Sequence, residues 1–109
     1  MEMKNKFVNH ARNVWERACK YLPRVDQFWF KYIYMEEVLG ENEKAREIFE
    51  AWMTWEPGQN AWNAYIKFEL RLRNIEKCIQ LYERFIDAHP VIKTYTEAAK
   101  FSEKHGPRG

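Results

Sequence analysis

Apolar residues recur every three or four positions along most of the chain, the spacing that places side chains on one stripe of an α-helix. The pattern is interrupted at prolines, at Gly40 and at short polar stretches. It predicts six helices, at 6–21, 27–39, 42–55, 61–72, 75–88 and 94–104. Asp26, Asn42, Asn60 and Asn74 are predicted N-caps, because their side-chain oxygens can accept hydrogen bonds from the free amides of a first helical turn.

A motif of aromatic residues repeats at a fixed distance. Trp62, Tyr65 and Glu69 stand 33 residues after equivalent residues in the second predicted helix, a period typical of helical repeats. The alternate helices carry a small residue, an aromatic residue four positions later and a proline eight positions after that. The residues predicted to form the core and corners of the repeats are Trp15, Trp29, Tyr32, Phe49, Trp62, Tyr65, Phe68, Tyr82, Pro23, Pro57 and Pro90.

These observations predict an all-α fold, a right-handed superhelical solenoid of antiparallel helix pairs with about six helices. The predicted divisions are a half repeat at 6–23, repeats at 24–57 and 58–90, and a half repeat at 91–106. Phe7 and Phe101 are unlike the polar caps of complete arrays. We therefore expect a segment of a longer array, marginally stable alone or self-associating through exposed repeat ends.

The strings around the repeated positions carry a family resemblance. Trp-x-x-Tyr-x-x-Phe-Glu at 62–69, with Ala-Arg-x-x-Phe-Glu at 45–50 and a proline after it, resembles the half-a-TPR (HAT) repeat of RNA-processing proteins. The longer stretch 22–40 is similar to the crooked neck family of pre-mRNA splicing factors. In the last copy, Ala98 and Ser102 depart from the motif.

The resemblance implies a HAT/TPR-like solenoid that serves as a scaffold of the spliceosome. It implies membership of the Nineteen complex, location in the nucleus, and other splicing-factor proteins as partners in pre-mRNA splicing and spliceosome assembly. Residues predicted to lie on outward faces or corners are candidates for partner binding: Arg24, Lys31, Tyr34, Lys67, Arg71 and Arg73.

Composition argues against several other classes of function. The net charge is +2 with charges interspersed, which is weak support for a nucleic-acid or membrane surface. No run approaches the ~20 apolar residues that span a bilayer, so no membrane contact is expected. Two cysteines fit a reducing compartment and a soluble intracellular chain better than a disulfide scaffold.

No catalytic, cofactor or metal site is predicted. Glu36 with Glu37, and the repeated column of Glu16, Glu50 and Glu83, could in principle supply paired carboxylates, but a repeated column cannot be one active site. The three histidines occupy different repeat positions, whereas metal ligands must converge. The chain is therefore predicted not to be an enzyme.

Three alternatives stay open. The solenoid surface could contact RNA, directly or weakly, since alternating aromatics and cations suit single strands. The chain could be a HAT scaffold of another RNA-processing complex, such as mRNA 3′-end cleavage or rRNA maturation. It could also be a TPR-like peptide binder.

Overall fold

The computed structural model describes residues 2–105, with side chains from residue 7 onward. Six α-helices make up most of this range, and it contains no strand, so the predicted all-α chain of six helices is confirmed. The chain divides into two compact units, Met1–Pro57 and Gly58–Gly109. Their boundary coincides with the predicted start of a repeat at residue 58.

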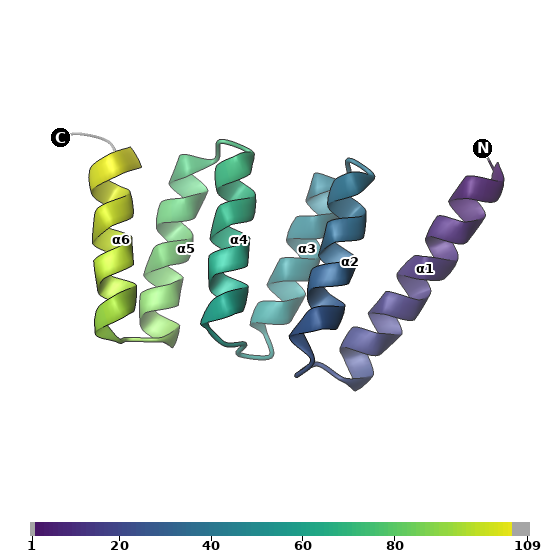
Figure 1. Ribbon diagram of the computed structural model, residues 1–109, viewed down its shortest axis with the longest axis horizontal. Helices are drawn as coiled ribbons and strands as arrows, with labels where there is room; N and C mark the ends of the chain where they lie inside the picture. The colour runs from purple at the N-terminus through teal and green to yellow at the C-terminus, as the bar shows by residue number, and fades with distance from the viewer. Residues whose placement is uncertain (1, 106–109) are drawn as a thin grey trace. The chain divides into compact units, whose positions relative to one another are not determined.

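Unit 1 contains three consecutive helices, α1 Glu2–Tyr21, α2 Asp26–Val38 and α3 Asn42–Met53. Each packs against the next and runs antiparallel to it (Figure 1). On α2 the buried residues are Trp29, Tyr32, Ile33 and Glu36. Their steps of three and four residues define one helix face, which explains why α2 packs with this side toward its neighbours.

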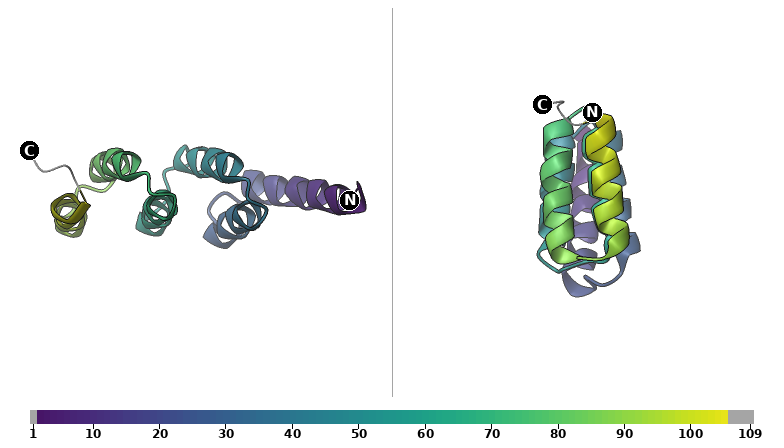
Figure 2. Two further views of the ribbon diagram at one scale, coloured as in Figure 1. Left: turned by 90° about the horizontal axis from the view of Figure 1, so that it is seen from above. Right: turned by 90° about the vertical axis from the view of Figure 1, so that its left-hand side faces the viewer.

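Unit 2 also contains three consecutive helices, α4 Gln59–Arg71, α5 Ile75–Ala88 and α6 Ile92–His105. The helix α5 packs against both α4 and α6. Seen from above, α4 and α6 lie on the same side of α5 (Figure 2). Unit 2 therefore has one side built from two parallel helices and an opposite side built from α5 alone.

Stacked aromatic pairs occupy equivalent places in the two units. Trp29 stacks on Trp52 with ring centroids 5.6 Å apart and planes at 4°, and Trp62 stacks on Phe85 at 5.7 Å and 8°. Both pairs join the first helix of a repeat to its second helix. Such pairs contribute about 0.5–1.5 kcal/mol beyond the area that they bury. The period of the sequence thus reports a repeated packing contact.

The predicted N-caps are wrong for α2, α3 and α4. Asp26, Asn42 and Asn60 lie inside the first turn, because the N-cap positions lie one or two residues earlier than predicted. No side chain at those N-cap positions makes a capping hydrogen bond. Asn74 does occupy the N-cap position of α5, but its Nδ2 donates to Glu69 Oε1 at 2.9 Å. The other boundaries agree within two residues, except that α1 begins at Glu2.

The first helix of each repeat ends in the same backbone motif. Gly40 after α2 has φ +77°, and Arg73 after α4 has φ +64°, so both residues are left-handed. The following amides, of Glu41 and Asn74, donate to the carbonyls of Glu36 and Glu69 at 2.9 and 3.0 Å. This six-to-one bond is the Schellman ending. The predicted stop at Gly40 is confirmed, and Arg73 adopts the same conformation without being a glycine.

Candidate functional site

Most of the residues predicted to form the repeat core are buried. Trp29, Tyr32, Phe49, Trp62, Tyr65, Phe68 and Pro57 lie in the interior. Trp15, Tyr82 and Pro23 are half-buried. The carbonyl of Pro23 accepts a hydrogen bond from Trp29 Nε1 at 3.0 Å. This bond connects the corner between α1 and α2 to α2 itself.

Two positions near the C-terminal half repeat differ in burial. Pro90 is exposed in the corner between α5 and α6, where it follows the end of a helix as predicted and does not fill the core. Phe101 is buried, although it is predicted at an open end, because its ring lies 5.1 Å from that of Tyr82 on α5. Phe7 on α1 remains 68% exposed.

All six predicted partner-binding residues are exposed, three in unit 1 and three in unit 2. Lys31 and Tyr34 share one face of α2 in unit 1. Lys67 and Arg71 share one face of α4 in unit 2, since residues four apart on a helix are neighbours. Arg73 occupies the left-handed corner after α4. The structure therefore offers two small exposed faces, one in each unit.

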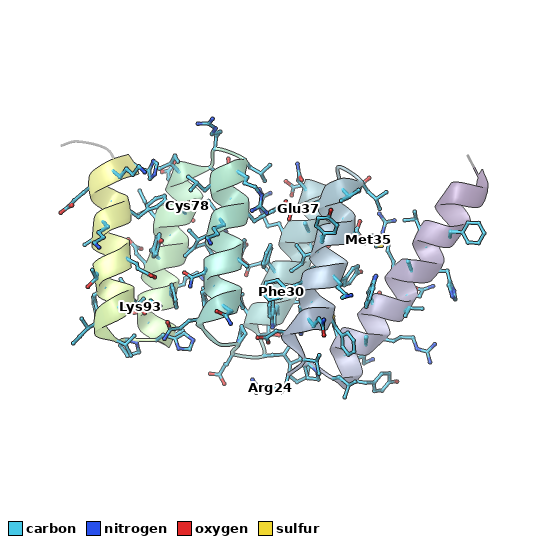
Figure 3. The ribbon with its side chains drawn as sticks, viewed as in Figure 1. Arg24, Phe30, Met35, Glu37, Cys78 and Lys93 are labelled. Atoms are coloured by element: carbon cyan, nitrogen blue, oxygen red, sulfur yellow. The ribbon has the colours of Figure 1, made fainter. Side chains whose placement is uncertain are left out.

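Arg24 has a structural contact that the sequence did not reveal. Its Nη1 donates to the carbonyl of Trp55 at 2.7 Å and lies 3.4 Å from that of Glu56. Trp55 and Glu56 follow the end of α3, where the last carbonyls of a helix lack partners within the helix. Arg24, at the corner between α1 and α2, thus satisfies the end of α3 (Figure 3). Arg24 thus has a structural contact in addition to its exposure, and its predicted role in partner binding stays a prediction.

The glutamates of the repeated motif are buried, which sequence reasoning missed. Glu36 and Glu69 are both 0% exposed. Arg12 donates two hydrogen bonds to the Glu36 carboxylate, from Nε to Oε2 at 2.7 Å and from Nη2 to Oε1 at 2.8 Å. The carboxylate raises the pKa of the Arg12 guanidinium by this hydrogen bond. Glu36 is thus a packing element and not half of an acid/base pair with Glu37.

The sequence held a signal for this ion pair. Glu36 and Glu69 occupy the same repeat position, and an arginine follows the small residue of the motif at Arg12 and again at Arg46. A carboxylate inside an apolar helix face needs a cationic partner, because an unpaired buried charge is costly. Two charges recurring in step with the core aromatics therefore predict a buried pair.

The cysteines and titratable groups provide no reactive centre. Burial raises the pKa of Cys19 to about 12 and that of Cys78 to about 11, which keeps both thiols protonated and unreactive. The Cys78 thiol donates to the carbonyl of Ile66 at 3.5 Å. Within the part of the chain that the structure describes, no group of His, Cys, Asp and Glu side chains could hold a metal ion.

A groove of about 360 Å³ opens on unit 1 between its three helices. Its apolar floor includes Trp29 and Ile48. Its charged lining residues are Glu16, Lys20, Lys44 and Glu47. Because these two negative and two positive charges sum to zero, the groove favours no particular ligand chemistry.

The comparison with protein families decides what this architecture is. Residues 1–91 match the family described as the pre-mRNA-splicing factor Syf1/CNRKL1 N-terminal HAT repeat. The chain belongs to this HAT-repeat family. The membership confirms the predicted HAT repeat, and with the six observed helices it confirms an all-α helical repeat fold. Among described residues, no helix of this HAT chain has the length and apolar content to cross a membrane.

The HAT chain resembles several splicing proteins over 84–100% of its length. It is 54% identical to Crooked neck-like protein 1 of Homo sapiens over 112 residues, which cover 100% of this chain and 13% of the relative. It is 48% identical over 94 residues to Pre-mRNA-splicing factor clf1 of Aspergillus fumigatus, which cover 84% of this chain and 14% of the relative. It is 41% identical over 108 residues to Pre-mRNA-splicing factor CLF1 of Yarrowia lipolytica, which cover 93% of this chain and 16% of the relative. The HAT chain thus spans about a seventh of these relatives.

Proposed function

We propose that this chain is a protein–protein interaction scaffold of the spliceosome, acting in the nucleus in pre-mRNA splicing and spliceosome assembly. The observation that carries the proposal is membership of a HAT family whose similar members are named as splicing factors. From the resemblance to the crooked neck family we further infer that the chain acts in the Nineteen complex, with other splicing-factor proteins as partners.

The surface of the chain supports a binding role and not a chemical one. The repeated aromatic residues, among them Trp29 and Trp62, are stacked inside the units and cannot serve as platforms for bases. The buried Glu36 carboxylate is occupied by Arg12. What remains on the outside is a set of regular helix faces, the feature through which helical repeats bind protein partners. The function is accordingly one of holding partners, without catalysis or a cofactor.

Affinity purification of the tagged chain from nuclear extract, with and without ribonuclease, tests the proposal by mass spectrometry. Recovery of splicing proteins that survives ribonuclease is the expected result. Recovery that disappears with ribonuclease would replace the protein scaffold by an RNA-binding function. Recovery of the mRNA 3′-end cleavage or rRNA maturation machinery would keep the HAT scaffold but move it to another complex.

Self-association through the terminal helices is a second part of the proposal. Phe7 and Tyr21 on α1 are 68% and 72% exposed, and Ile92 and Tyr95 on α6 are 87% and 53% exposed. Exposed large apolar side chains on the two terminal helices support this proposal, because exposed apolar patches mark interaction sites on proteins. Sedimentation velocity should show concentration-dependent association that Phe7→Ser with Tyr95→Ser reduces. A strictly monomeric chain at every concentration would exclude it.

A further inference from the structure

Charge is distributed unevenly along this chain. Residues 1–57 contain nine basic and ten acidic residues, whereas residues 58–109 contain nine basic and six acidic residues. Their net charges are −1 and +3, which sum to the +2 of the whole chain. The excess positive charge therefore belongs to unit 2.

Within unit 2, four exposed lysines lie on α4 and α6, whereas Lys77 and Arg84 lie on α5 and are half-buried. Lys93, Lys100 and Lys104 follow one another on α6 at steps of seven and four residues, so they share one helix face. Lys67 is exposed on α4, opposite the arc of that helix that holds its buried residues. Figure 2 places α4 and α6 on the same side of α5, and Lys93 stands at the start of α6 in Figure 3. We call these four lysines the basic face.

Acidic residues of unit 2 lie mostly elsewhere. Glu76, Glu83 and Asp87 are exposed on α5, the opposite side of the unit. Glu69 on α4 is buried. Two acidic residues, Glu97 and Glu103, lie on α6 among described residues. Glu97 is half-buried and shares the helix face of Lys93 and Lys100, so the four lysines exceed these two carboxylates by two charges. The basic face therefore keeps a positive potential, and charge of this kind steers and selects an oppositely charged partner.

We propose that the basic face of unit 2 docks an acidic, Asp- and Glu-rich segment of a protein partner. The proposal rests on the scaffold function proposed above and names the chemistry of one of its partners. RNA fits this face less well, because single strands are held by aromatic stacking together with cations. Tyr95, the exposed aromatic residue of α6, stands two residues after Lys93 and so points to another side of the helix.

The number of cations on the basic face also favours an acidic protein segment over RNA. Four lysines would neutralise about four phosphates, and a contact of that size is lost quickly as salt rises. A flexible acidic segment needs only local charge complementarity, and exposed pairs each add a modest contribution. A helical scaffold would use such a contact to choose among partners and speed their encounter.

Fluorescence anisotropy on the full chain tests the proposal with two labelled probes, a peptide of glutamate and serine and an oligouridine. The face variant is Lys67→Gln, Lys93→Gln and Lys100→Gln. The control variant is Arg17→Gln, Lys20→Gln and Lys44→Gln, which removes the same three charges from exposed positions in unit 1. Both variants have a net charge of −1 in place of +2. Circular dichroism checks that each variant keeps its helices.

The expected result is saturable binding of the peptide that the face variant weakens about tenfold and the control variant leaves within about twofold. Equal weakening by both variants would reduce the effect to net charge and overturn the proposal. Oligouridine binding that exceeds peptide binding and is lost in the face variant would overturn it in favour of RNA. Absence of peptide binding to the wild-type chain at low salt would also overturn it.

The nuclear-extract purification separates this inference from the scaffold function. If the face variant recovers the same splicing proteins as the wild-type chain, the basic face docks none of them and only the inference fails. If the wild-type chain recovers no splicing proteins, the scaffold function itself fails. Loss of a subset of partners in the face variant, but not in the control variant, is the outcome that the inference predicts.

Discussion

Removing Arg12 from its pair with Glu36 should destabilise the chain far more than a surface mutation. In Arg12→Met the apolar stem of the side chain is kept, but the Glu36 carboxylate, 0% exposed, loses both of its bonds to the guanidinium. Breaking a buried ion pair in this way costs about 3–5 kcal/mol. Since the Arg12 side chain is 25% exposed, we expect the lower end, about 3 kcal/mol.

Thermal unfolding followed by circular dichroism measures this loss. For a domain of this size about 3 kcal/mol corresponds to a fall in Tm of about 12–24 °C. The double variant Arg12→Met with Glu36→Leu removes the stranded charge as well, so it should recover most of the lost stability. The control is Glu43→Gln, because Glu43 pairs with Arg46 at a side chain that is 84% exposed, and we expect less than about 1 kcal/mol there.

Two results would refute the reasoning. If Arg12→Met cost less than about 1 kcal/mol, the pair would be solvated in solution and Glu36 would not need its partner. If the double variant were as unstable as the worse single variant, the two residues would act independently, and the repeated glutamate would have another role.

Three further expectations concern the core, a corner and pH. Trp62→Ala, which truncates a buried residue, should lower the free energy of unfolding in urea titrations by about 3–5 kcal/mol. Trp55→Ala, at a residue that is 39% exposed, should lower it by about 1 kcal/mol. Equal losses in the two variants would contradict the assignment of Trp62 to the core. Arg73→Gly should stabilise the chain by about 1 kcal/mol by relieving its φ of +64°, and a lower Tm would contradict this. Burial raises the pKa of Cys19 from 9.0 and of Tyr32 from 10.0, each to about 12. Both neutral forms are therefore favoured in the folded chain, and stability should be fully present below pH 9 and fall as pH rises from 9 toward 12, with a smaller fall in Cys19→Ala.

Much of the fold followed from periodicity alone. The recurrence of apolar residues every three or four positions predicted the number of helices and placed most helix boundaries within two residues of those observed. Cap identity did not follow, because Asp26 and Asn42 are good N-cap types that the backbone here takes into the first turn. The stacking partners of the motif tryptophans were also missed, although Trp52 and Phe85 stand one repeat apart.

The surface was harder to predict than the core, for a physical reason. Burial imposes a period on a sequence, whereas an exposed side chain can be replaced without a packing cost. Arg24 looked like a free corner residue, and only the position of the end of α3 showed that its guanidinium satisfies carbonyl groups. The basic face likewise depends on α4 and α6 sharing one side of α5, an arrangement that no single helix displays.

Depletion of the protein from splicing-competent nuclear extract tests the central claim most directly. Antibodies against this chain should remove splicing of a labelled pre-mRNA, and adding back the affinity-purified material should restore it. A mock depletion with unrelated antibodies is the control. Loss and recovery of spliced product are the results that the account predicts. Undiminished splicing after complete depletion would contradict it, and would mean that this HAT chain works in another process.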